Sequence, residues 1–189
     1  MTILIALWLI FFISHSLFAA TKVKAFFEKN LKIAPPQYRL LYNAFAVLVL
    51  ALIVLQLLKT ESEMIFERIE FIFGLGSGIA IGSLWLLKLA AQDIHLPSFL
   101  GFSAAPESLG LITTGLYKIV RHPLYFSTTV LLIGLFLMFP TVNVAVSIVF
   151  ILIYIIIGIE FEEKKLRQTF GTAYDDFARG KKKFLPFIY

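Results

Sequence analysis

A short polar segment ahead of one apolar stretch contains the residues whose chemistry stands out most. Arg121 and His122 come directly before Pro123, and Tyr117 and Tyr125 flank them. Proline suits the first position of a helix, where its missing N–H is not needed. Arg121 and His122 are therefore expected at a helix N-terminus, whose free N–H groups and dipole favour an anion. The cluster predicts a pocket for a carboxylate or phosphate; the alternative is an anchor at a membrane surface, a depth that these residue types favour.

A second polar group follows the last apolar stretch of the chain. Glu160, Glu162 and Glu163 stand where that stretch ends. These carboxylates could hold a cation or pair with Arg121, and the simpler alternative is the solvated end of a helix.

Three further ionisable residues are candidates for a site. His15 lies inside the first apolar stretch, and Asp93 and His95 end the third. An ionisable residue within a membrane span is a functional candidate. A neutral histidine bonded to a neighbouring helix, and a cap at a helix end, are the structural alternatives.

The composition indicates the kind of protein that must position these groups. Of 189 residues, 59% are hydrophobic and 15% are charged, against about 45–50% and about 25% in soluble domains. The mean hydropathy is +0.88. A soluble domain of this size could not bury so much apolar surface, so we expect an integral membrane protein. The absence of cysteine excludes disulfides, thiolate metal sites and cysteine nucleophiles, and the scattered histidines suggest no metal site.

Five apolar stretches are each long enough to be read as membrane-spanning helices, which need about 20 residues. Helices are expected because backbone polar groups in lipid must be satisfied within the segment. The first stretch lacks a basic start and a clean cleavage site, so it is interpreted as a membrane helix and not as a secretory signal. The expected spans are Ile3–Ala20, Leu40–Leu58, Ile69–Ala90, Leu124–Phe139 and Val142–Ile159.

The distribution of charge predicts the orientation of these spans. Lysine and arginine gather in the first loop, before residue 124 and after residue 159, whereas the loop at 59–70 is acidic. Five crossings with an outside N-terminus would place every basic segment in the cytoplasm. We therefore expect a multi-pass protein of the bacterial inner membrane with a cytoplasmic C-terminus.

The last two spans are expected to form a tight hairpin. Its turn lies near Pro140, Thr141 and Asn143. Such a hairpin brings the segment before Leu124 beside the segment after Ile159. Farther on, apolar residues at near-helical spacing predict an amphipathic tail helix against the bundle or the lipid surface. These residues are Phe161, Leu166, Phe170, Tyr174 and Phe177.

Glycines recur within the third expected span. They are Gly74, Gly76, Gly78 and Gly82. Gly74 and Gly78, and Gly78 and Gly82, are four residues apart, the small-residue spacing that permits close contact between helices. No strand precedes them, so a nucleotide-binding loop is not indicated. The glycine face would permit a dimer as easily as internal packing.

The C-terminal motifs together resemble a known superfamily. The run Gly115–Tyr125, the segment Glu162–Tyr174 and the closing Leu185-Pro186 resemble isoprenylcysteine carboxyl methyltransferases, a superfamily that includes phospholipid methyltransferases. In the N-terminal part, His15-Ser16 and Tyr38–Asn43, together with Asp93, are similar to the NnrU-like branch, which also contains methanethiol S-methyltransferases.

This resemblance implies S-adenosylmethionine as the cofactor, bound at the cytoplasmic face between the last two helices and the tail. Arg121 and Glu163 are then expected to be catalytic, and His15, Asp93 and His95 are candidates for contact with the acceptor. The residues implied to line the cofactor pocket are Tyr117, Val120, Arg121, His122, Pro123, Tyr125, Glu162 and Glu163.

The expected protein is thus an all-α membrane methyltransferase for a small or lipophilic acceptor, either a thiol, a carboxylate or a lipid amine. Residues 1–92 would form a three-helix membrane region, and residues 93–189 the methyltransferase-like core. The expected partners are the bilayer and the acceptor, with no nucleic acid. The alternative is an NnrU-like accessory protein without enzymatic activity; a transporter subunit is less favoured because no inverted repeat is visible.

Overall fold

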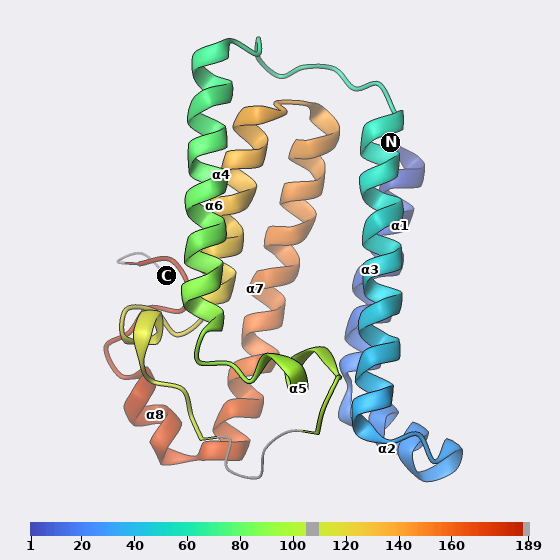
Figure 1. Ribbon diagram of the computed structural model, residues 1–189, viewed down its shortest axis with the longest axis vertical. Coiled ribbons are helices and arrows are strands. Elements are labelled where there is room, and N and C mark those ends of the chain that lie inside the picture. Colours follow the sequence, from blue (N-terminus) through green and yellow to red (C-terminus); the bar gives the residue numbers. More distant parts are fainter. Residues whose placement is uncertain (105–109, 187–189) are drawn as a thin grey trace. The chain divides into compact units, whose positions relative to one another are not determined.

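The computed structural model describes residues 1–104 and 110–186, and in this part of the chain the regular structure is helical. Figure 1 shows the order of the elements. They are α1 (Thr2–Ala19), α2 (Thr21–Leu31), α3 (Pro35–Lys59), α4 (Glu70–Ala91), α5 (Leu96–Leu100), the 3-10 turn η1 (Gly115–Lys118), α6 (Pro123–Met138), α7 (Val142–Phe170) and α8 (Thr172–Ala178).

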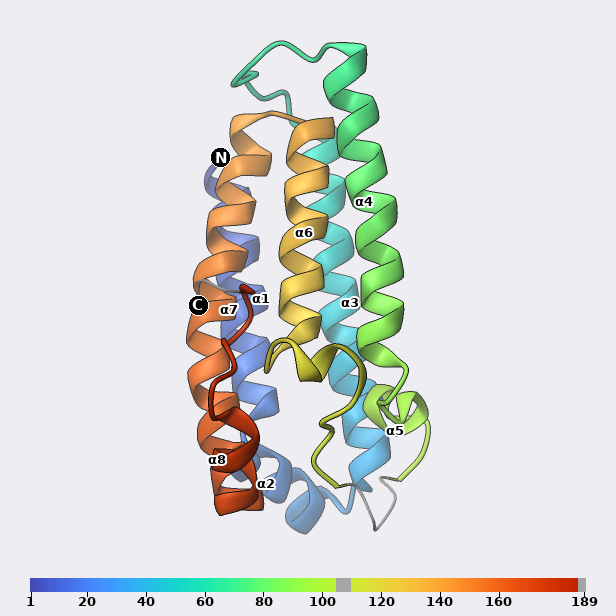
Figure 2. The same ribbon diagram turned by 90° about the vertical axis from the view of Figure 1, so that its left-hand side faces the viewer.

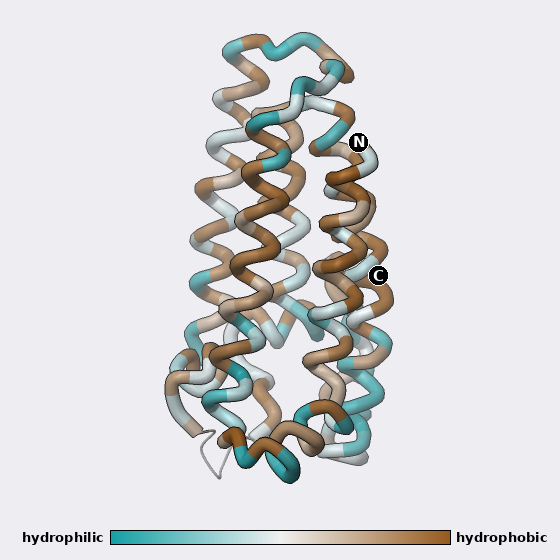
Figure 3. The backbone as a smooth tube through the Cα atoms, turned by 90° about the vertical axis from the view of Figure 1, so that its right-hand side faces the viewer, coloured by the Kyte–Doolittle hydropathy of each residue, from teal (hydrophilic) through white to brown (hydrophobic). Residues whose placement is uncertain are grey.

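Four helices among the described residues are long and apolar enough to cross a membrane, namely α1, α3, α4 and α7. α6 is also apolar but has only 16 residues. Figure 3 shows the apolar middles of the helices and the polar segments that join them. The protein is therefore an all-helical integral membrane protein, and the fifth crossing expected at α6 stays a prediction.

The chain forms two compact units. One comprises Met1–Ser62 with His95–Leu109, and the other comprises Glu63–Ile94 with Gly110–Tyr189. The third span, α4, groups with the C-terminal part because it packs along α6. The expected functional division between residues 92 and 93 stays a prediction.

In the first unit, polar side chains connect α1, α3 and α5. The Tyr38 hydroxyl donates to the Phe18 carbonyl (2.8 Å), and Arg39 Nη1 donates to the Ser98 carbonyl (2.6 Å). α3 begins with two prolines, at positions where a helix does not need their missing N–H groups. These bonds fix the N-terminal end of α3 against its neighbours.

In the second unit, glycine allows α4 and α6 to approach closely. A Cβ added at Gly134 would lie 2.7 Å from the Ala80 nitrogen and 2.8 Å from the Gly76 carbonyl oxygen. Of the four glycines singled out in the sequence, Gly76 makes this contact, whereas a Cβ at Gly74, Gly78 or Gly82 would meet no described atom within 4 Å. Close packing is thus confirmed at Gly76, but the interval of four indicated the wrong face of α4, because Gly76 and Ala80 face α6.

α6 and α7 form the expected hairpin, with α4 beside α6 (Figures 1 and 2). The Thr141 side chain accepts a hydrogen bond from the Val144 N–H (3.4 Å) and so caps α7. The turn is also held from outside, since the Ile65 N–H donates to the Pro140 carbonyl (2.7 Å). The hairpin returns both of its free ends to the same region of this unit.

The tail differs from the single separate helix that the spacing suggested. α7 continues past Ile159 to Phe170, and Gly171 (φ 54°, ψ −132°) separates it from the short α8. The aromatic residues of the tail are therefore divided between the end of α7 and α8.

Candidate functional site

The N-terminal end of α6 is held by the C-terminal segment of the chain. The Arg121 N–H donates to the Lys182 carbonyl (3.0 Å), and the His122 N–H donates to the Lys183 carbonyl (2.9 Å). Phe184 is buried against Ile155 and Ile159 of α7. The backbone at Arg121 and His122 is thus positioned by a segment about 60 residues later in the chain.

Glu163 is the centre of the charged cluster. Its side chain is only 2% exposed. Oε1 lies 2.7 Å from Arg121 Nη1 and 3.4 Å from His122 Nε2, and Oε2 lies 3.3 Å from Arg167 Nη2. A buried carboxylate needs such partners because burial of an unpaired charge is very unfavourable. Both carboxylate oxygens of Glu163 therefore already form ion pairs with basic side chains of the protein.

Glu162 lies in a different environment from its neighbour. Its side chain is 44% exposed, and Oε2 lies 3.6 Å from His122 Nδ1. The His122 ring therefore stands between the two carboxylates, with one nitrogen toward each. Glu162 is the carboxylate of this pair that can reach a ligand.

Tyr117 extends the site toward the end of α4. Burial raises the pKa of Tyr117 to about 12, and the nearby carboxylates of Glu162 and Asp93 raise it as well. Asp93 accepts a hydrogen bond from the Thr114 hydroxyl (2.8 Å), just before η1. Asp93 thus connects the end of α4 to the turn that carries Tyr117.

Arg167 connects α7 to α8 on the other side of the cluster. Besides Glu163, it contacts Asp175, with 3.2 Å between Nε and Oδ1. Its guanidinium carbon lies 5.5 Å from the centre of the Tyr174 ring. Burial and then the Glu163 charge raise the pKa of Tyr174 to about 12, so its hydroxyl stays protonated at neutral pH.

Arg121 Nε is a buried donor that makes no hydrogen bond to the described residues. Buried polar groups are usually hydrogen-bonded. Arg121 therefore has a donor available for an acceptor group such as a carboxylate.

The second unit contains all eight residues that the resemblance assigned to the cofactor pocket, and Asp93 with them. The expected meeting of the segment before Leu124 with the segment after Ile159 is confirmed by the contact between Arg121 and Glu163. Val120 and Pro123 are buried and offer no polar side chain. They support the backbone of the site.

His15 and His95 belong to the first unit. His15 Nε2 is 2.9 Å from the Tyr42 hydroxyl, and its ring stacks on Phe11. His95 precedes α5, and its Nδ1 accepts a hydrogen bond from the Ser98 N–H (3.4 Å). Each histidine therefore has a structural partner of the kind considered as its alternative.

Three contributors to the site were not assigned from the sequence. Arg167, Tyr174 and the backbone of residues 182–184 all contact or position its charged groups. The spacing of Glu163 and Arg167, four residues apart on one helix, was a usable signal for an ion pair. Pairing between the C-terminal segment and residues 120–122 had no comparable signal.

Comparison with known proteins decides the family. The description "phospholipid methyltransferase" applies to the family that matches residues 71–173, more than half of the chain. The chain belongs to this family. The match includes nearly all of α4, the α6–α7 hairpin and the four charged residues Arg121, His122, Glu162 and Glu163 at its base.

Three similar proteins are all named methanethiol S-methyltransferase. A methanethiol S-methyltransferase of Crocosphaera subtropica is 30% identical over 95% of this chain and 72% of the relative. Methanethiol S-methyltransferase 2 of Bradyrhizobium diazoefficiens is 28% identical over 95% and 71%. That of Pseudomonas deceptionensis is 30% identical over 70% and 50%. No solved structure matches the chain.

Proposed function

We propose that this protein is a membrane methyltransferase that uses S-adenosylmethionine and acts on a small or lipophilic acceptor. The observation that carries the proposal is the cluster of Arg121, His122, Glu162 and Glu163 at the base of the α6–α7 hairpin. This cluster joins an available carboxylate to an oriented guanidinium in a chain of the phospholipid methyltransferase family.

The donor set fits the ends of this cofactor. S-adenosylmethionine carries a carboxylate, an ammonium group and a sulfonium, and supplies an electrophilic methyl group when bound. Arg121, with a buried unpaired Nε, suits the carboxylate. Glu162 suits the ammonium group, and the face of Tyr117 suits a cation.

Glu163 has a positioning role in this proposal instead of the catalytic one expected from the sequence. Its two oxygens hold Arg121 and Arg167, which leaves them unavailable to a ligand. It fixes the Arg121 guanidinium, and His122 fixes Glu162. Catalysis would then come mainly from orientation of the acceptor toward the methyl group, which can contribute about 7–11 kcal/mol.

An apolar cavity of about 240 Å³ lies between the turn-side halves of α6 and α7, about 20 Å along α7 from the charged cluster, so it offers an apolar surface toward the bilayer and not the place of methyl transfer. Its lining includes Leu132, Phe136 and Ile148. Such a cavity suits an apolar molecule that arrives from the bilayer. A thiol, named for the relatives, is the first acceptor to test, and carboxylates and lipid amines follow.

The proposed arrangement in the membrane has five crossings, with α6 as the fourth. The N-terminus would lie outside, and the charged cluster and C-terminus would face the cytoplasm, as the basic segments favour. Residues 93–189 would supply the cofactor site, and the N-terminal helices would form the membrane region.

A methyl-transfer assay tests the proposal. The purified protein in lipid nanodiscs would receive S-adenosylmethionine labelled in its methyl group, together with methanethiol, a prenylated cysteine or phosphatidylethanolamine. Labelled product from one of these acceptors, absent in Arg121→Ala, is expected. A folded protein that neither binds the cofactor nor forms product with any acceptor would contradict the proposal and favour the accessory-protein alternative.

A further inference from the structure

α2 is held at the end of two helices that can cross a membrane. Only Ala20 separates α1 from α2, and only residues 32–34 separate α2 from α3. Both α1 and α3 are long and apolar enough to span. With such short connections α2 cannot move far from the ends of its neighbours, so it lies at the boundary between the bilayer and water.

α2 exposes both apolar and basic side chains. Phe26 is 56% exposed and Leu31 is 55% exposed. The Phe27 ring packs on Tyr38 of α3, with ring centres 5.1 Å apart. Lys22 and Lys29 are exposed as well. A short helix with exposed apolar side chains and exposed lysines is typical of a helix lying in the membrane interface.

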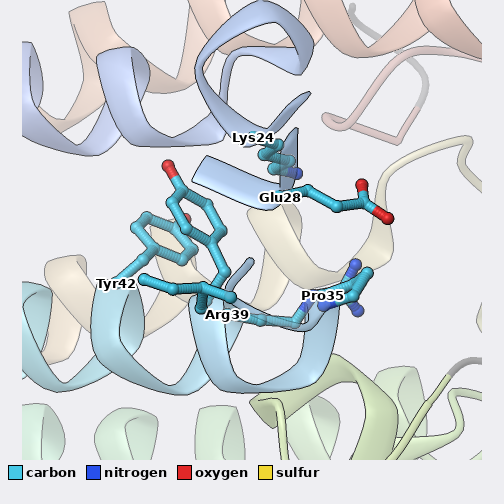
Figure 4. Close-up of a pocket in the computed structure, with 7 residues that line it drawn as sticks. Lys24, Glu28, Pro35, Arg39 and Tyr42 are labelled. Carbon is cyan, nitrogen blue, oxygen red and sulfur yellow. The ribbon is translucent and has the colours of Figure 1, made fainter. Parts of the chain in front are cut away.

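A cavity of about 60 Å³ lies between α2 and the first turns of α3. Figure 4 shows that Lys24 and Glu28 reach it from α2, and that Pro35, Arg39 and Tyr42 face them from α3. The volume is enough for a few water-sized groups, which is the size of a compact oxyanion.

The walls of this cavity are fixed by contacts elsewhere. Arg39 donates to the Ser98 carbonyl (2.6 Å), and the Tyr38 hydroxyl donates to the Phe18 carbonyl (2.8 Å). Tyr42 contacts His15 (2.9 Å). A guanidinium held in one orientation is well suited to bind phosphate oxygens. Lys24 adds a second cation, and Glu28 can accept a hydrogen bond from a hydroxyl group.

We propose that α2 and the start of α3 bind the phosphodiester of an anionic phospholipid whose headgroup carries hydroxyl groups, as in phosphatidylglycerol. The phosphate occupies the cavity between Lys24 and Arg39, the headgroup hydroxyls face Glu28, and Phe26 and Leu31 contact the acyl chains. This site is separate from the charged cluster of the second unit and does not depend on the proposed activity.

Native mass spectrometry of the detergent-purified protein tests this site. The protein is titrated with phosphatidylglycerol and, separately, with phosphatidylcholine of the same acyl chains. We expect phosphatidylglycerol to bind several-fold more tightly. Lys24→Gln should weaken that binding about fivefold, the effect of about one lysine charge at an anionic headgroup. Lys59→Gln, at the other end of α3, is the matched control and should bind as the wild type does.

Equal affinity for the two lipids, or unchanged phosphatidylglycerol binding in Lys24→Gln, would overturn the proposal. If Lys24→Gln fails to fold, Lys24→Met, which keeps the apolar part of the side chain without its charge, must show the same loss. In a further arm, inorganic phosphate is titrated alone. If phosphate binds as tightly as phosphatidylglycerol, and Lys24→Gln removes it, the site recognises a free anion and the assignment to a lipid is wrong.

Discussion

At the scale of single residues, Glu162 and Glu163 show how neighbours in sequence take different roles. Glu163 is buried between two guanidinium groups, whereas Glu162 is nearly half exposed beside His122. The difference follows from helical geometry, since adjacent residues on α7 point about 100° apart. The structure thus places Glu163 in a buried ion-pair network and leaves its neighbour Glu162 partly exposed.

This separation predicts different effects of two matched substitutions. Glu163→Gln removes the charge that Arg121 and His122 face in a buried setting, and disruption of a buried pair costs about 3 kcal/mol or more. For a chain of this size we expect the melting temperature in detergent to fall by roughly 10 °C. Glu162→Gln, at the exposed neighbour, should leave it nearly unchanged. An equal loss in both variants would contradict the assigned roles.

Much of the site could be predicted from the sequence, because its residues are concentrated in two short motifs. Arg121, His122 and the two glutamates stand out chemically among apolar helices. What could not be predicted is which carboxylate is buried, because that depends on how α7 is rotated about its axis against α6. His15 and His95 also stand out as ionisable residues, but each has a local hydrogen-bond partner.

At the scale of elements, the second unit depends on the close contact of α4 with α6. Gly76 and Gly134 face each other with no space for a side chain on Gly134. This contact places the end of α4, with Asp93, beside the turn that carries Tyr117. The separation of α4 from α6 therefore affects the shape of the charged site.

Gly134→Ala should destabilise the protein by about 1–3 kcal/mol, because the added methyl group would meet backbone atoms that have no freedom to move. We expect a melting temperature lower by about 2–10 °C. Gly78→Ala is the control, since a Cβ there meets no described atom within 4 Å. If the two variants have the same melting temperature, the contact between α4 and α6 is looser than described.

The C-terminal segment is the second element that shapes the site. Phe184 is 4% exposed and anchors residues that bind the backbone of Arg121 and His122. Phe184→Ala should lower the free energy of unfolding by about 3–5 kcal/mol. It should also weaken binding of S-adenosylhomocysteine at a temperature where the variant is folded. Phe161→Ala, at a residue 71% exposed on α7, should change neither the stability nor the binding. The same behaviour in both variants would argue against an anchoring role.

The success of sequence-based prediction differed between elements for physical reasons. The helices α1, α4 and α6 begin and end within one or two residues of the expected spans, since hydropathy changes sharply there. α3 begins earlier than expected, at Pro35, and α7 continues eleven residues past Ile159, because polar residues can extend a helix beyond the lipid. α2 and α5 were not among the expected elements, since only stretches long enough to span the membrane were assigned and these helices have 11 and 5 residues.

At the scale of the whole molecule, an outside N-terminus and a cytoplasmic charged cluster require an odd number of crossings between them. The chain has no cysteine, so single cysteines introduced at Glu61 or Lys164 can be labelled without background. Five crossings place three spans between these positions and therefore put them on opposite sides of the membrane.

A membrane-impermeant maleimide should label Glu61→Cys in intact cells and Lys164→Cys only after permeabilisation. Labelling of both positions from the same side would mean that α6 does not cross, in which case four spans would be the correct number. Labelling of Lys164→Cys alone in intact cells would reverse the proposed orientation.

Calorimetric titration with S-adenosylhomocysteine, the product form of the cofactor, measures whether the cluster at the base of the hairpin binds the methyl-donor cofactor. We predict binding by the wild type and at least tenfold weaker binding by Arg121→Ala and by Glu162→Gln, with Glu162→Gln as thermally stable as the wild type. Absence of binding by the folded wild type, or unchanged affinity in both variants, would contradict the account.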